Sequence, residues 1–285
     1  MTERNTFIRF LLSGLATLTG LLLTATAAGA AGAPGGPAPR GHHAAARIFQ
    51  GDGFDTCQAP DLATMSAWRA NSTYRAAGIY FGGRARACSS QKYLTPDWVR
   101  QTSAAGWSLL PIYVGSQSPC VNGTNKNPYL IDTANPGAQG SAEGQDAVSS
   151  AQALGLEQGS ALYLDMEAYD IGDSACASAT LKYVQAWDQA VDAAGYLSGF
   201  YSSADSGIRQ MEQSRLAGAA SLPDVIWYAR WGVAATLTAE PSLAPTAWTP
   251  HARIHQYTGS VTESHGGKSL TVDRDLVDAP VAVVG

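Results

Sequence analysis

The feature that most limits the possible folds of this chain is an alternation of short apolar runs with helix-like segments from residue 47 onward. The runs are rich in β-branched and aromatic residues and end at glycine, proline or acidic residues, as strands do. We predict strands at residues 47–55, 78–81, 108–114, 161–167, 199–203, 225–229, 253–257 and 270–275. We predict helices at residues 60–70, 96–105, 140–154, 177–194 and 204–216. Strands that alternate with helices favour a parallel sheet.

The number of strands distinguishes the two common parallel architectures. Eight strands in roughly 230 residues fit a single closed (β/α)8 barrel of the TIM type better than an open doubly wound sheet. The last third of the chain is poor in helical pattern, so we expect an α/β barrel that is irregular there. No Gly-x-Gly-x-x-Gly or P-loop motif follows a predicted strand, which leaves nucleotide binding without support.

The residues before the first strand have the composition of an export signal and a spacer. Arg4 and Arg9 precede an apolar stretch at 10–23, and small residues at 25–33 offer several Ala-x-Ala cleavage sites. The resulting division is a secretory signal peptide at 1–33, a Gly/Pro/Ala-rich linker at 34–46 and the barrel at 47–285.

Without a twin-arginine pair, the general secretion route is the simpler prediction, and an uncleaved membrane anchor is the alternative. After cleavage we expect no stable membrane insertion, and a secreted, extracellular or cell-envelope-associated protein.

The four cysteines of the chain lie in the predicted barrel. An even number of cysteines in an exported chain favours disulfides, and their spacings are too wide for a Cys-x-x-Cys zinc site. Four cysteines allow three pairings. Each cysteine lies just beyond a predicted strand end, so neighbouring loops should pair, which favours Cys57–Cys88 and Cys120–Cys176.

Charge and histidine content argue against two further classes of partner. Charged residues make up only 14% of the chain, the net charge is -5, and no basic run or stripe is present, so we expect no nucleic-acid partner. His251 and His255 would form a poor metal pair without a third ligand. We accordingly expect no metal and no cofactor.

The strongest indication of chemistry is the stretch Leu162-Tyr163-Leu164-Asp165-Met166-Glu167, an apolar run that ends in two acids two residues apart. Side chains at i and i+2 of a strand point the same way, so Asp165 and Glu167 should share a face. Two carboxylates at the end of a buried strand are costly unless they are paired, hydrated or used. Glycoside hydrolysis is a common use of such a pair.

Other predicted strand ends carry acids and aromatic residues, and active sites of α/β barrels form at these ends. Sugars require this combination, because acids transfer protons and aromatic faces pack on pyranose rings. We therefore predict a site with catalytic Glu167 and Asp165 and with substrate-binding Asp55, Asp273, Tyr80, Tyr201, Trp227 and Trp231. Taken singly, each of these aromatic residues also suits a packing role, and His255 suits the core or rim better than the role of a base.

Together, the strand-end motifs resemble one bacterial family. The motifs are Gly53-Phe54-Asp55-Thr56-Cys57, Ile79-Tyr80-Phe81-Gly82-Gly83, Pro111-Ile112-Tyr113-Val114-Gly115, Asp165-Met166-Glu167-Ala168-Tyr169, Trp227-Tyr228-Ala229-Arg230-Trp231 and His255-Gln256-Tyr257. They are similar to domain-of-unknown-function family 1906, the glycoside-hydrolase-like domain of exported cell-envelope proteins. Their order is also similar to glycoside hydrolase family 25, the barrel-shaped bacterial muramidases. The resemblance covers nearly all of residues 48–280.

The resemblance implies a role for each acid. By position, Glu167 would be the general acid, Asp165 would steer the substrate N-acetyl group or stabilise the transition state, and Asp55 and Asp273 would hold the sugar. The muramidases usually continue their first motif with Val-Ser, whereas Asp55 is followed here by Thr56-Cys57. We expect this cysteine to tie down the loop and reshape the cleft.

These observations favour a secreted glycoside-hydrolase-like protein that hydrolyses or binds N-acetylated cell-wall glycan of the peptidoglycan type. Burial should raise the pKa of the general acid toward neutrality while its partner stays charged. The main alternative is a non-catalytic glycan-binding or cell-envelope domain on the same fold. A metal-dependent hydrolase that uses Asp55, Asp165 and Asp273 as oxygen ligands is a third possibility.

Overall fold

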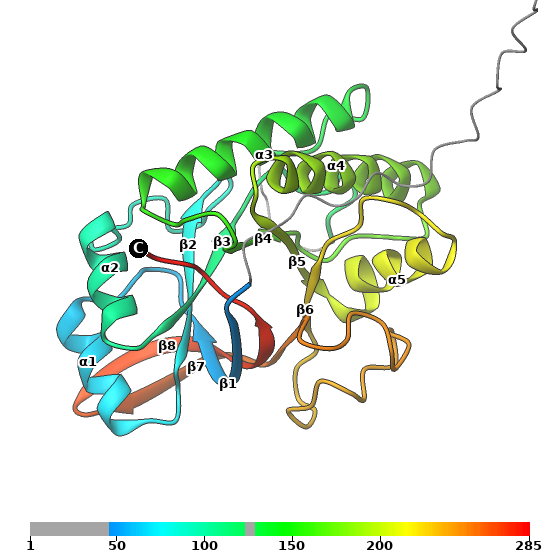
Figure 1. Cartoon of the computed structure of the whole chain (residues 1–285). Coiled ribbons are helices and arrows are strands. Elements are labelled where there is room, and N and C mark those ends of the chain that lie inside the picture. The colour runs from blue at the N-terminus through cyan, green and yellow to red at the C-terminus, as the bar shows by residue number, and fades with distance from the viewer. Residues whose placement is uncertain (1–45, 123–128) are drawn as a thin grey trace, which may run out of the picture. The chain divides into compact units, whose positions relative to one another are not determined.

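Residues 46–122 and 129–285 are described in this computed structural model, and they contain a closed eight-stranded barrel with helices outside it (Figure 1). The predicted α/β barrel is therefore confirmed. The elements are β1 (Ile48–Asp55), α1 (Leu62–Asn71), β2 (Ala76–Gly82), α2 (Pro96–Ala104), β3 (Ser108–Tyr113), α3 (Pro136–Ala153), β4 (Ala161–Asp165), α4 (Ser174–Ala193), β5 (Leu197–Ser203), η1 (Ala204–Ile208), α5 (Arg209–Leu216), β6 (Val225–Ala229), β7 (Arg253–His265) and β8 (Lys268–Pro280).

The predicted signal peptide, and the predicted linker up to residue 45, lie outside the described residues. Within the described part of the chain, no helix has both the length and the apolar character needed to cross a bilayer.

The direction of the last strand corrects the prediction of a parallel sheet. Strands β1 to β7 pair in parallel with their sequence neighbours, whereas β8 is antiparallel to both β7 and β1. Gly266 and Gly267, with φ of 59° and 76°, form a two-residue turn between β7 and β8, so no helix fits there. The segment between β6 and β7 also lacks a helix, which confirms the expected irregularity of the last third.

The reversed strand β8 still delivers acids to the functional end of the barrel. In the β1–β8 register, Asp55 lies opposite Asp273, and Gly53 lies opposite Asp275. Because β8 runs against β1, it is an early part of β8 rather than its carboxyl end that meets the end of β1.

The core forms in two layers, inside the barrel and between the barrel and its helices. Inside, Tyr163 and Trp227 meet edge to face with ring centroids 5.4 Å apart. Outside, Trp187 of α4 is fully buried, and α3 lies side by side with α4 (Figure 1). Gly140 permits this approach, because a Cβ there would come within 2.2 Å of the carbonyl oxygen of Tyr183. Strand β4 is buried throughout, as expected for a strand covered on both faces.

Two disulfides join the loops at one end of the barrel. They are Cys57–Cys88 and Cys120–Cys176, the pairing that the sequence favours, and no free cysteine occurs in the described residues. The first joins the loop after β1 to the loop after β2. The second joins the loop after β3 to the first turn of α4.

Candidate active site

The four acids singled out in the sequence lie around one cavity at the mouth of the barrel. Asp55 is the last residue of β1, Asp165 is the last residue of β4, Glu167 follows two residues later, and Asp273 belongs to β8. All four line a cavity of about 590 Å³. We call this group, together with Asp275 beneath it, the mouth cluster.

The backbone around Asp165 and Glu167 is held by a buried glutamine. Strand β4 ends at Asp165 rather than at Glu167 as predicted, but the two side chains still line the same cavity. The side-chain amide of Gln117 donates to the carbonyl oxygen of Asp165 at 3.0 Å, and its oxygen accepts from the Glu167 N–H at 2.7 Å. Met166, between them, is fully buried. Gln117 therefore holds the backbone so that Asp165 and Glu167 point the same way, as the sequence predicted for two residues at i and i+2 of a strand.

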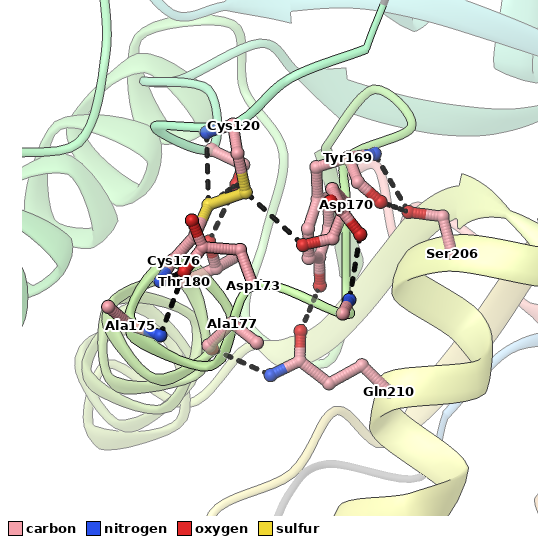
Figure 2. The surroundings of a disulfide bond; sticks show 12 residues. Cys120, Tyr169, Asp170, Asp173, Ala175, Cys176, Ala177, Thr180, Ser206 and Gln210 are labelled. Atoms are coloured by element: carbon pink, nitrogen blue, oxygen red, sulfur yellow. Dashed lines mark hydrogen bonds between the residues drawn. A yellow bond between two sulfur atoms is a disulfide. The ribbon is translucent and has the colours of Figure 1, made fainter.

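The loop after Glu167 is fixed from a second side (Figure 2). Ser206 Oγ accepts from the Tyr169 N–H at 2.8 Å and donates to the Tyr169 carbonyl oxygen at 2.6 Å. The Tyr169 hydroxyl donates to Gln210 of α5 at 2.5 Å. The Cys120–Cys176 disulfide holds the start of α4, where this loop ends. Few degrees of freedom remain for Glu167, as a catalytic group requires.

Asp55 accepts hydrogen bonds on both carboxylate oxygens. The Tyr80 hydroxyl donates to Oδ1 at 2.9 Å, and the Gln256 side-chain amide donates to Oδ2 at 2.8 Å. The oxygen of Gln256 in turn accepts from the Tyr201 hydroxyl and from Trp231 Nε1, each at 3.0 Å. Gln256 also donates to Asp273 at 3.4 Å. It thus connects four of the predicted site residues, although the sequence did not single it out.

A fifth acid, Asp275, lies beneath Asp55 and is fully buried. It accepts from Trp227 Nε1 at 2.9 Å, and burial, followed by the charge of Asp55, raises its pKa well above the usual value. Trp227 is itself fully buried, so the prediction that it contacts substrate is wrong. Its indole fills the barrel interior and supports the mouth cluster from below.

Burial is the largest cause of the raised pKa values of the four aspartates of the mouth cluster. It raises the pKa of Asp55 to about 7, with the charge of Asp273 as the second cause. Burial, and then the charge of Glu167, raises the pKa of Asp165 well above its usual value. Asp165 Oδ1 has no hydrogen-bond partner among the described residues. The raised pKa of Asp165 contradicts the expectation that the partner of the general acid stays charged, because burial disfavours the carboxylate form of Asp165.

Aromatic residues extend the site beyond the acids. Tyr80 lines the first cavity, while Tyr201 and Trp231 line a second cavity of about 400 Å³. Trp231 is 54% exposed, which leaves its ring available to a ligand. Glu167 borders both cavities.

The two histidines near β7, His251 and His255, line neither of these two cavities. The ring of His255 stacks on Tyr228 at 4.5 Å and bonds to the carbonyl oxygens of Arg230 and Thr236, so it is a core residue. His251 pairs with Asp278 at 2.7 Å. In the part of the chain that the structure describes, no group of three or more acids, histidines or cysteines is arranged to hold a metal ion.

Three residues of the site were not predicted from the sequence. Asp275 and Gln256 could have been predicted, because each lies in a predicted strand. The alternation of side chains along a strand can place each of them inside the barrel. Gln117 carries no such signal, because its role depends on the approach of β3 to β4.

Comparisons with known proteins place this arrangement in a family. Residues 66–277 match the model of the Rv2525c-like, glycoside hydrolase-like domain. The fold resembles an uncharacterized B. stearothermophilus protein (21% identity, TM-score 0.52, covering 80% of this chain and 95% of that chain). It also resembles the Tat-secreted protein Rv2525c of Mycobacterium tuberculosis in complex with L-tartrate (16% identity, TM-score 0.52, covering 80% of this chain and 96% of that chain). A third similar structure is that of the spore cortex lytic enzyme SleM of Clostridium perfringens (12% identity, TM-score 0.50, covering 80% of this chain and 67% of that chain).

No curated protein matches the chain significantly. At these identities the solved structures establish the fold alone. The family model, in contrast, spans well over half of the chain and includes Asp165, Glu167 and Asp273. The chain belongs to the Rv2525c-like family of glycoside hydrolase-like domains, in agreement with the resemblance stated from its motifs.

Proposed function

We propose that this chain is an exported glycoside hydrolase that cleaves N-acetylated cell-wall glycan of the peptidoglycan type, with Glu167 as general acid. The observation that carries the proposal is the position of Glu167 between an acid-lined cavity and an aromatic-lined cavity. A glycosidic bond lying over Glu167 would have one sugar in each cavity. The fold is shared with a spore cortex lytic enzyme, which fits a wall glycan as substrate.

The roles of the two paired acids follow from their surroundings. Glu167 would protonate the glycosidic oxygen as the bond breaks. Asp165 lines the same cavity, and its Oδ1 is without a partner among the described residues, which suits acceptance of a hydrogen bond from the substrate acetamide. Burial raises the pKa of Asp165 well above its usual value, and from this position its carboxyl group would orient the acetamide beside the glycosidic bond that Glu167 protonates.

The remaining site residues would hold the sugars. Asp55 and Tyr80 offer a hydrogen-bonded pair at the floor of the first cavity, and Asp273 lies beside them. The exposed ring of Trp231 would pack on a pyranose in the second cavity.

Turnover of purified peptidoglycan, followed by release of reducing ends, tests the proposal. Glu167→Gln keeps the size of the side chain but removes its transferable proton, so turnover should fall by about 10²–10⁴-fold while binding of glycan fragments persists. The matched control is Glu157→Gln, an exposed glutamate that lines neither cavity at the mouth, which should keep full turnover. Wild-type turnover that Glu167→Gln leaves unchanged would refute this assignment of the acid. Glycan binding without wild-type turnover would favour a non-catalytic binding domain.

Export is the second part of the proposal. Two disulfides in the described residues fit an oxidising compartment outside the cytosol. Mass spectrometry of the protein recovered from medium or cell wall should find an N-terminus created by cleavage within or directly after residues 25–33. Intact chain held in the membrane fraction would instead support the uncleaved anchor.

A further inference from the structure

Two arginines line the first cavity together with the acids. Arg84 and Arg86 lie on the loop after β2, and they are the only cationic side chains among the described residues that line this cavity. Acid-assisted cleavage of a neutral glycan requires carboxyl groups and aromatic faces, but it gives no role to a fixed positive charge at this place.

The two arginines have different partners. Arg84 forms an ion pair with Glu143 of α3 at 2.9 Å, and its guanidinium lies over the ring of Tyr129 at 5.0 Å. Arg86 donates only to backbone, from Nε to the Gly83 carbonyl oxygen and from Nη1 to the Tyr80 carbonyl oxygen, both at 3.1 Å. No carboxylate in the described residues forms an ion pair with it.

The charge of Arg86 interacts with that of Asp146, but among the described residues the two side chains form no ion pair. Its side chain is half-buried, and burial lowers its pKa from the usual value. The nearby carboxylate of Asp146 accepts a hydrogen bond from Tyr113 at 2.7 Å. Nη2 of Arg86 makes no hydrogen bond within the described residues. A half-buried guanidinium of this kind attracts a carboxylate, which it can bind through two parallel N–H groups.

The loop that carries the arginines is held in one conformation. Gly83 has a φ of 92°, and a Cβ there would come within 2.1 Å of the Val114 carbonyl oxygen. That oxygen accepts from the Ala85 N–H at 3.1 Å. At the far end, the Cys57–Cys88 disulfide joins the loop to the end of β1. A preorganised loop loses little entropy when a ligand binds.

We propose that Arg86, with Arg84 beside it, forms a carboxylate-binding subsite that selects glycans bearing an acidic substituent over neutral ones. The inference rests on the proposed function, since it assumes that the cavity receives glycan. It adds a specificity to that function: the acid-lined part of the cavity acts on the glycosidic bond, and the arginine loop recognises a carboxylate on the sugar next to it.

Binding to two probes tests the subsite in the full chain carrying Glu167→Gln, which blocks turnover. One probe is neutral chitotetraose, and the other is a peptide-free tetrasaccharide of alternating N-acetylglucosamine and N-acetylmuramic acid, which bears lactyl carboxylates. Adding Arg86→Gln should weaken binding of the acidic probe by about tenfold or more, the value of one charge-assisted hydrogen bond, and leave the neutral probe unchanged. Arg86→Lys should lose part of the affinity, because it keeps the charge but not the planar fork.

Arg100→Gln on α2 is the matched control, since Arg100 is exposed, pairs with Asp97 and does not line the cavity. It should change neither affinity. Equal weakening of both probes by Arg86→Gln, or no weakening of either, would overturn the subsite while leaving the proposed function in place. A chain with Glu167→Gln as its sole change that binds neither probe would overturn both.

Discussion

Two groups of buried carboxylates lie at opposite ends of this barrel. In the mouth cluster, Asp55 accepts hydrogen bonds from Tyr80 and Gln256, and four of the five acids line a cavity. At the other end, Asp188 of α4 is fully buried where β5 and β6 begin. Neither of its carboxylate oxygens has a hydrogen-bond partner in the described residues, although Ser198 lies near.

Burial has the same electrostatic effect in both places but a different consequence. It raises the pKa of Asp188 well above the usual value, and the charges of Asp192 and Asp224 add to that effect, much as the charge of Glu167 adds to the effect on Asp165. Asp188, however, lines none of the cavities described above. A raised pKa therefore does not identify a catalytic acid. Access to a cavity and a network that positions the acid distinguish the mouth cluster from Asp188.

The largest expected difference between the two groups is in turnover. Asp165→Asn should reduce turnover of peptidoglycan by about 10²-fold or more, because it removes an ionisable group next to the general acid. Asp188→Asn should leave turnover within about twofold, since no substrate atom reaches it. Steady-state kinetics of the two variants checks this. A comparable loss of turnover in Asp188→Asn, with the fold intact by circular dichroism, would show that access to the cavity does not distinguish Asp165 from Asp188.

Disulfide removal should give the next largest effect. Replacing Cys120 and Cys176 by serine should lower the free energy of unfolding by about 2–5 kcal/mol and also reduce turnover, because the loop after Glu167 loses an anchor. The disulfide does not touch Asp188, so the contribution of Asp188 to the pH dependence of stability should persist in the double variant. Urea unfolding of the double variant measures the change. Unchanged stability and turnover would show that the hydrogen bonds of Tyr169 hold the loop without the cross-link.

Asp188 should control part of the pH dependence of stability. Above the usual aspartate pKa of 3.8, the unfolded chain releases this proton while the folded chain keeps it, so stability falls as pH rises toward the folded-state pKa. Asp188→Asn should therefore raise the free energy of unfolding by about 1–3 kcal/mol at pH 8, with little gain at pH 4. Denaturant unfolding across this range tests the sign. Parallel pH profiles of the variant and the wild type would contradict the burial argument.

The smallest expected effect concerns the aromatic side of the site. Trp231→Ala should weaken glycan binding by about two- to tenfold, the equivalent of one aromatic contact of 0.5–1.5 kcal/mol. Leu216→Ala, at a residue that is 69% exposed on α5, is the control and should leave affinity unchanged. Calorimetric titration resolves this difference. Equal affinities of wild type and Trp231→Ala would exclude the second cavity from the glycan site.

The sequence predicted most of the fold because buried strands and amphipathic helices leave local patterns. Strand β6 was predicted at its observed bounds, and strand β3 within one residue. The β7–β8 hairpin was missed, since an apolar segment does not indicate the direction in which a strand pairs. Glycines 266 and 267 were the available signal for the turn.

The candidate site was predictable where it depends on spacing along one strand. Asp165 and Glu167 were found by their i and i+2 positions, and the structure places both at one cavity. The burial of Trp227 and the clamp by Gln117 depend on contacts between strands, which no local pattern records. The raised pKa of Asp165 has the same origin, because it follows from burial in the folded barrel.

The position of the substrate can be determined from a crystal structure of the Glu167→Gln variant with a bound tetrasaccharide of alternating N-acetylglucosamine and N-acetylmuramic acid. We expect the oligosaccharide to cross the mouth of the barrel, with sugars in both cavities and a glycosidic oxygen within hydrogen-bond distance of residue 167. The acetamide of one sugar should contact Asp165. An oligosaccharide bound away from the mouth, or confined to one cavity with no glycosidic oxygen near residue 167, would refute Glu167 as the general acid.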